Sequence, residues 1–130
     1  MSRKYSLASI REVWLNAYLN GDAGWLDYLE APCFIVVNGL TLVSKAEQIA
    51  FLERSRQKFQ GGRNGDFSFT QTVHVTLERE SWATVVGSFV SSRNGRQLSN
   101  CDFSEFWIST EGNWRIASLY LRDKSGAAET

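Results

Sequence analysis

The feature that most constrains this chain is a regular alternation of apolar and polar residues that begins at Phe67. From Phe67 to Leu77, apolar side chains stand at nearly every second position, and serine, threonine or histidine stands between them. This period of two predicts a β-strand with one buried face. Strand-like segments follow at 81–92, 96–109 and 114–122. Because consecutive strands joined by tight turns pair antiparallel, we expect a four-strand meander.

The turns between these segments carry their own signals. Asn94-Gly95 and Glu111-Gly112-Asn113 are short, polar and glycine-containing. Asparagine and glycine tolerate the positive φ values that tight hairpin turns require. Both segments therefore predict hairpin connections.

The region before residue 60 shows helical spacing instead. Leu7, Ile10 and Trp14 recur every three or four residues, and Ser6 precedes them as a candidate N-cap. The pair Asn20-Gly21 ends this run. The pattern predicts a first helix that ends close to residue 20.

A second, shorter helix and a hairpin follow. Asp22 is a candidate N-cap, and Pro32 ends the helix because the residue before a proline avoids the helical region. Residues 33–37 and 40–43 are strand-like, and the turn signal Asn38-Gly39 lies between them.

A third helix is predicted from a capping box. Ser44 caps the helix start, and Glu47, three residues later, reaches back to the backbone N–H of Ser44. The helical pattern fades near Phe59, and an apolar-free loop spans 61–66.

These elements define the expected architecture. We predict an α+β fold in the order α-α-β-β-α-β-β-β-β, with three helices packed on a strongly curved antiparallel sheet that encloses a pocket. Residues 1–124 form a single domain, and residues 125–130, which are small and polar, form a mobile tail.

Composition excludes several function classes. The 14 basic and 14 acidic residues balance, so no positive excess is available to bind nucleic acid. The single histidine and two separated cysteines predict no metal and no other cofactor. No signal sequence or membrane span is apparent, and the cysteines suit a reducing compartment, so we expect a cytoplasmic protein.

Apolar residues occur on both faces of the predicted sheet. In segment 81–92, Val85 and Phe89 share one face, whereas Trp82 and Val86 share the other. The helices cover only one face, and several aromatic residues in water would be uncommon. We therefore expect a homodimer through the outer face, with the interface residues Trp82, Val86, Trp107, Trp114, Ile116 and Tyr120.

The order of elements and three local phrases resemble a known superfamily. The phrases are 17–22 (AYLNGD) at the end of the first helix, 44–47 (SKAE) at the start of the third, and the hairpin from Phe106-Trp107-Ile108 to Trp114-Arg115-Ile116. Over most of its length the chain is similar to the nuclear transport factor 2-like superfamily, and within it to SnoaL-like and ketosteroid-isomerase-like proteins. The resemblance implies a cone whose pocket often holds a small apolar molecule.

The same resemblance allows a comparison of catalytic positions. Ketosteroid-isomerase-like proteins use a carboxylate base, a tyrosine from the first helix and a protonated carboxyl group. The matching positions here hold Asn38, Trp14 and Ser104. Asparagine does not abstract a proton at neutral pH, so the resemblance does not extend to this chemistry.

Asp102 and Tyr18 are the remaining catalytic candidates. If Asp102 faces the cone, burial raises its pKa, which suits general acid–base catalysis; the alternative is a structural or solvated aspartate. Tyr18 either points its hydroxyl into the pocket or packs in the core. We expect the pocket to be lined by Trp14, Trp25, Asn38, Val85, Phe89, Asn100, Ser104, Phe106, Ala117 and Leu119.

Three functions remain open at this point. The favoured one is a SnoaL-like domain that binds a small apolar molecule, because the matched positions lack a catalytic base. The second is a proton-transfer enzyme of the cyclase, dehydratase or isomerase type that uses Asp102. The third is a protein-interaction module that uses the outer sheet face.

Overall fold

The computed structural model describes residues 5–59 and 67–124. Both the expected loop at 61–66 and the expected tail at 125–130 lie outside the described residues. The order of elements is α-α-β-β-α-β-β-β-β, as the sequence predicts.

The first helix begins and ends as its capping residues indicate. Helix α1 spans Leu7–Asn20, and the Ser6 hydroxyl accepts a hydrogen bond from the backbone N–H of Ser9 at 3.1 Å. At the other end Gly21 adopts a left-handed conformation with φ of 66°, which lets the chain leave the helix without a Cβ clash. The sharp turn brings α2 back against α1.

The other two helices also have the predicted caps. The Asp22 carboxylate accepts from the backbone N–H of Trp25 at the start of α2 (Ala23–Leu29). Ser44 and Glu47 exchange two hydrogen bonds, of 3.1 and 2.9 Å, at the start of α3 (Lys45–Phe59). These bonds satisfy backbone N–H groups that have no partner inside the helix.

Six strands form one sheet in the order β2-β1-β6-β5-β4-β3. The strand bounds are β1 Glu30–Asn38, β2 Thr41–Ser44, β3 Phe67–Glu78, β4 Trp82–Arg93, β5 Arg96–Thr110 and β6 Asn113–Asp123. The sheet is mixed rather than wholly antiparallel as expected, because β1 pairs with β6 in parallel. These two strands are far apart in the sequence, so no hairpin turn forces them to run in opposite directions.

Tight turns join the strands of the meander. Asn94 and Gly95 have φ values of 55° and 79°, and Glu111 and Gly112 have values of 56° and 79°. Two consecutive positive φ angles match the right-handed twist of the flanking strands. The two glycine-containing turn signals are therefore confirmed.

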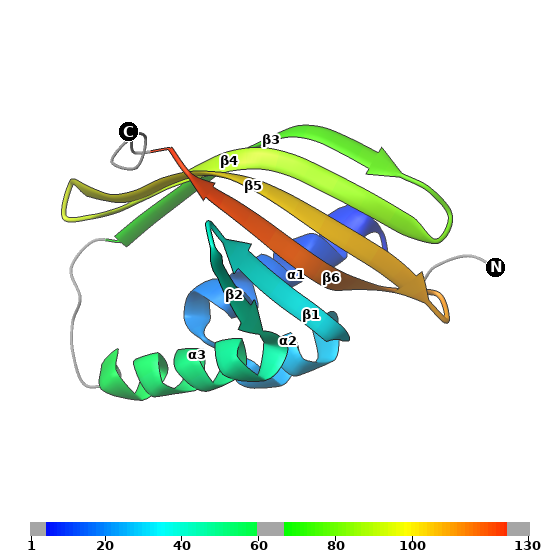
Figure 1. Cartoon of the computed structure of the whole chain (residues 1–130), viewed down its shortest axis with the longest axis horizontal. Coiled ribbons are helices and arrows are strands. Elements are labelled where there is room, and N and C mark those ends of the chain that lie inside the picture. The colour runs from blue at the N-terminus through cyan, green and yellow to red at the C-terminus, as the bar shows by residue number, and fades with distance from the viewer. Residues whose placement is uncertain (1–4, 60–66, 125–130) are drawn as a thin grey trace.

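The three helices lie on one side of the sheet, and the long strands β3, β4 and β5 arch over them (Figure 1). The core between these layers is rich in tryptophan. Trp14 from α1 meets Trp107 from β5 edge to face at 6.0 Å, and both are buried. Such pairs add about 0.5–1.5 kcal/mol beyond the burial of their area.

A β-bulge decides which residues of β6 face the core. The register shifts between the pairs Phe106–Ser118 and Trp107–Ile116, so Ala117 is an extra residue in β6. A bulge moves the following side chains to the opposite face. Ile116 and Leu119 are consequently both buried, although strict alternation would place them on opposite faces.

Half of the residues expected at the dimer interface are buried in the core instead, because of this bulge and the register of β5. Trp107, Trp114 and Ile116 are at most 2% exposed in the single chain, so they belong to the core and not to the outer face. Trp82, Val86 and Tyr120 do lie on the outer face and are partly exposed.

No helix within residues 5–59 and 67–124 is both long and apolar enough to cross a membrane.

Candidate functional site

The main candidate site is a cavity of about 190 Å³ between α1 and the inner face of the sheet. Strands β3 to β6 form its roof, and one side of α1 forms its floor. Its lining residues are Arg11, Trp14, Leu15, Tyr18, Leu19, Phe67, Phe69, Gln71, Phe89, Ser91, Phe103, Glu105, Leu119 and Leu121.

Most of the cavity wall is apolar and aromatic. Phe69 stacks on Phe89 at 5.1 Å between ring centroids, and Phe89 lies 6.3 Å from Phe103. These rings come from three neighbouring strands. They meet because side chains on the same face of adjacent strands are neighbours. They offer a surface on which an apolar or aromatic molecule can pack.

One end of the cavity is polar and holds a buried ion pair. The Arg11 guanidinium donates to both carboxylate oxygens of Glu105, through Nε to Oε1 and through Nη2 to Oε2, each at 2.7 Å. Nη2 also donates to Gln71 Oε1 at 2.8 Å, and Trp107 Nε1 donates to Glu105 Oε1 at 2.9 Å. Two-point pairing of this kind holds both side chains in a single geometry.

The cavity has an opening between α1 and β3. A second hollow, of about 430 Å³, adjoins it and shares Arg11, Leu15, Leu19, Phe69 and Gln71 with its lining. β3 is an edge strand, and within residues 5–59 and 67–124 no further strand covers this side of the sheet. Leu15 and Leu19 therefore lie where the cavity meets the adjoining hollow.

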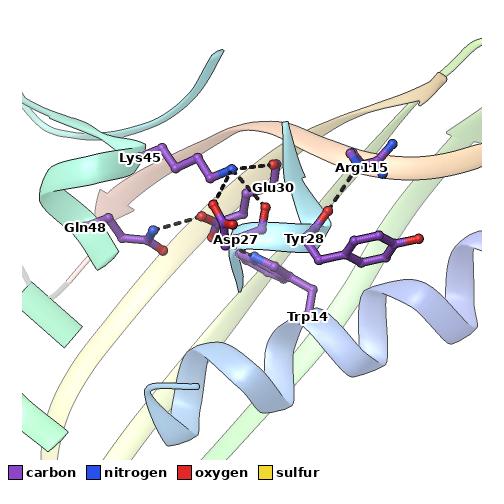
Figure 2. A network of polar contacts seen from close by, with 7 residues as sticks. All are labelled: Trp14, Asp27, Tyr28, Glu30, Lys45, Gln48 and Arg115. Carbon is purple, nitrogen blue, oxygen red and sulfur yellow. Dashed lines mark hydrogen bonds and ion pairs between the residues drawn. The ribbon is translucent and has the colours of Figure 1, made fainter. Parts of the chain in front are cut away.

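A second buried polar network surrounds Glu30 behind the cavity floor (Figure 2). Trp14 Nε1 donates to Glu30 Oε2 at 3.1 Å, and Gln48 Nε2 donates to Oε1 at 2.9 Å. Lys45 Nζ donates to the backbone oxygens of Asp27 and Glu30. The network joins all three helices at the start of β1, and Trp14 links it to the cavity wall.

Burial changes the proton affinity of two groups in this region. Loss of solvent raises the pKa of the Glu30 carboxyl, although hydrogen bonds from Trp14 and Gln48 and the charge of Lys45 oppose the rise. Burial, and then the charge of Glu30, raises the pKa of Tyr18. Tyr18 is part of the cavity lining, and its raised pKa keeps the hydroxyl protonated at neutral pH.

Asp102 lies outside the cavity, contrary to the expectation from alternation. Its carboxylate pairs with Arg122 at 2.9 Å and Lys124 at 3.4 Å on the outer face of the sheet. The hydrogen bond from Arg122 is the main cause of a lowered pKa for Asp102. The site therefore lacks the desolvated aspartate on which proton-transfer chemistry would depend.

The remaining predicted lining residues fall into separate groups. Trp14, Phe89 and Leu119 line the cavity together with Tyr18. Val85 is buried in the core, Ala117 is the extra residue of the β6 bulge, and Asn38 is exposed beside the β1–β2 turn.

The others lie on different surfaces. Asn100, Ser104 and Phe106 share the outer face with Asp102, because the buried residues of β5 are Cys101, Phe103, Glu105 and Trp107. Trp25 lines a groove of about 660 Å³ between the first half of α1, α2 and the start of β6. The face of β5 that turns inward is therefore opposite to the predicted one.

Sequence reasoning missed the polar end of the cavity. Glu105 stands between Phe103 and Trp107 at alternate positions, and Arg11 stands four residues after Leu7 and three before Trp14. Both charges therefore occur on otherwise apolar faces. A charge in such a position signals a buried partner of opposite sign.

In the described part of the chain, no three histidine, cysteine, aspartate or glutamate residues gather into a group that could hold a metal ion.

Known structures resemble this fold at low sequence identity. An NTF2-like protein from Cytophaga hutchinsonii matches with a TM-score of 0.73 and 13% identity, over 95% of this chain and 99% of that one. An NTF-2 like protein of unknown function from Silicibacter pomeroyi matches at 0.66 and 18%, over 91% and 92%. An NTF2-like protein with a cystatin-like fold from Novosphingobium aromaticivorans matches at 0.69 and 15%, over 92% and 80%.

No protein-family model and no curated protein matches the sequence. Identities this low show the fold alone, which is the NTF2-like fold with its cystatin-like cone.

Proposed function

We propose that this chain, which has the NTF2-like fold, binds one small and largely apolar molecule in the cavity between α1 and the sheet. The observation that carries the proposal is a cavity with an aromatic wall, a single polar end and an opening between α1 and β3. Ligand sites commonly combine an apolar lining with a few placed polar groups.

The cavity volume limits the size of the ligand. An apolar cavity of about 150 Å³ in another protein stays dry and accepts benzene. A volume of about 190 Å³ therefore suits a single substituted ring better than a fused-ring system. The rings of Phe69, Phe89 and Phe103 would contact its faces.

Toluene is a suitable first probe because it is apolar and carries one ring. We expect isothermal titration calorimetry to show one binding site per chain. The melting temperature should rise with toluene concentration, since a ligand at 100 times its Kd stabilises the folded state by about 2.7 kcal/mol.

A filled cavity provides the matched control. Leu121→Trp places a larger side chain in the cavity wall, whereas Leu77→Trp makes the same change on the outer face of the sheet. We expect the first variant to lose toluene binding and the second to keep it. Equal binding by both variants would place the ligand elsewhere and refute the proposal.

We also propose that two copies associate through the outer sheet face. Four of the apolar residues that remain exposed there form an outer patch, which we define as Val75, Val86, Phe106 and Tyr120. In a dimer with a two-fold axis through this patch, the patch of one copy would contact the patch of the other. The Asp102, Arg122 and Lys124 charges at one end of the patch provide both signs for such self-pairing.

A further inference from the structure

The charges at the polar end of the cavity cancel. Arg11 and Glu105 face each other in two short hydrogen bonds, and their side chains are only 10% and 2% exposed. The two charged side chains of the cavity lining therefore form an ion pair, and the lining has no net charge. A charged ligand would add an unpaired charge beside this pair, and an uncompensated charge in a buried site is costly.

At this end the carboxylate acceptors already have hydrogen-bond partners in the part of the chain that the structure describes, whereas one guanidinium nitrogen does not. Both oxygens of Glu105 already accept hydrogen bonds, from Arg11 and Trp107. Arg11 uses Nε and Nη2 as donors to Glu105 and Gln71. Among the described residues none accepts a hydrogen bond from Arg11 Nη1, so this end offers a donor.

The position of Arg11 makes that donor available to a ligand. Arg11 lines both the cavity and the adjoining hollow at its opening. Its Cζ atom lies 5.2 Å from the centre of the Phe103 ring, which is part of the aromatic wall. A ring that packs on this wall would bring a short substituent next to the guanidinium.

From these contacts, and resting on the proposed binding function, we propose that the cavity selects neutral ring compounds with one hydrogen-bond acceptor, such as an aryl carbonyl, and rejects carboxylates. The acceptor receives a hydrogen bond from Arg11 Nη1. Glu105 is a specificity-determining residue, because its charge cancels the attraction that Arg11 would otherwise exert on an anion.

The test compares acetophenone with benzoate, which have the same number of non-hydrogen atoms. At neutral pH we expect acetophenone to bind the native protein at least about tenfold more tightly, a difference of about 1.4 kcal/mol. Benzoate also loses more hydration than acetophenone in any apolar cavity, so this comparison needs a variant.

Glu105→Gln separates the two causes. It removes the negative charge and leaves Arg11 to pair with an incoming carboxylate. We expect the ratio of the benzoate Kd to the acetophenone Kd to fall by at least about tenfold in this variant. The matched control is Glu30→Gln, which removes a buried carboxyl that is not in the cavity lining, and its ratio should equal that of the native protein.

A nuclear magnetic resonance measurement on the native protein covers the case in which Glu105→Gln does not fold. Acetophenone should shift the side-chain N–H signals of Arg11, and toluene should leave them close to their free positions. An unchanged Kd ratio in a folded Glu105→Gln, or Arg11 signals that acetophenone does not move, would overturn the inference while toluene binding stands. Failure of toluene and acetophenone to bind at all would instead refute the proposed function.

Discussion

Two buried glutamates show how the surroundings of a residue decide its role. Glu105 lies in a two-point ion pair with Arg11 at the cavity end, whereas Glu30 has only neutral side-chain donors, Trp14 and Gln48, on its carboxyl oxygens. Lys45 reaches the backbone oxygen of Glu30 and forms its ion pair with Asp27. Burial without a direct counter-charge is the reason that the pKa of Glu30 rises.

The raised pKa of Glu30 predicts a pH-dependent stability. The folded state binds a proton at a pH where the unfolded chain, with its ordinary value of 4.5, has released it. Stability from this group is therefore greatest at acidic pH and is lost as the pH rises from about 4.5 through the folded pKa. Relative to Glu30→Gln, the native protein should lose up to about 1.4 kcal/mol per pH unit in that window. Urea denaturation across the window measures the difference.

Glu47 provides a comparison of opposite sign. Hydrogen bonds from the backbone and side chain of Ser44 lower the pKa of Glu47. Relative to Glu47→Gln, the native protein should therefore lose stability as the pH falls below the ordinary value of 4.5. If the stability difference between the native protein and Glu30→Gln changed with pH in the same direction as the difference from Glu47→Gln, the raised pKa of Glu30 would be wrong.

At the scale of elements, two of the irregularities in strand register shape the inner face of the sheet. One lies at His74 in β3 and the other at Ala117 in β6. Gly87 faces the first bulge across the β3–β4 ladder, where a Cβ atom would lie 2.1 Å from the carbonyl oxygen of Thr72. This close backbone approach explains a glycine in the middle of a long strand.

Gly87→Ala tests that account of the bulge. The added methyl group would meet a backbone oxygen that cannot rotate away, as well as the Phe103 ring. We expect a loss of about 1–3 kcal/mol in the free energy of unfolding. Gly24→Ala, in α2 and with no atom closer than 3.7 Å to the new Cβ, should instead stabilise the protein by about 0.5–1 kcal/mol. Urea denaturation of both variants would reveal the contrast, and a neutral Gly87→Ala would contradict it.

At the scale of the whole molecule, the two faces of the sheet have different surroundings. Its inner face holds the core and the cavity, and its outer face carries the outer patch. The helices lie on one side only, so nothing in the chain's described residues covers the patch (Figure 1). A second copy is the partner that we propose for it.

The dimer proposal predicts a change in mass. Phe106→Arg on the outer patch should convert a dimer into a monomer, as sedimentation equilibrium measures, because two new charges would face one another across the two-fold axis. Leu40→Arg, at the exposed tip of the β1–β2 hairpin, is the control and should keep the native mass. A native protein that sediments as a monomer at high concentration would reject the dimer, and the patch would then be open to a different protein.

Local sequence patterns by themselves determined the elements, their order and the residues that cap the helix starts. The end of the second helix was predicted less well, because it stops at Leu29 and Pro32 lies inside β1 (Glu30–Asn38). Ser6, Asp22, and the Ser44–Glu47 pair cap the helices as predicted, and the three predicted glycine-containing turns join antiparallel strands. These features depend on neighbours within a few residues, so the sequence contains the information directly.

Only the tertiary structure decided which face of each strand turns inward and which distant strands pair. The β6 bulge moves Ile116 and Leu119 to one face, and the register of β5 places Glu105 inside and Asp102 outside. A shift of one residue exchanges the two faces of a strand, and an alternating pattern with apolar residues on both faces does not specify the choice. The pairing of Arg11 with Glu105, 94 positions apart, depends on that choice, and so does the polar end of the cavity.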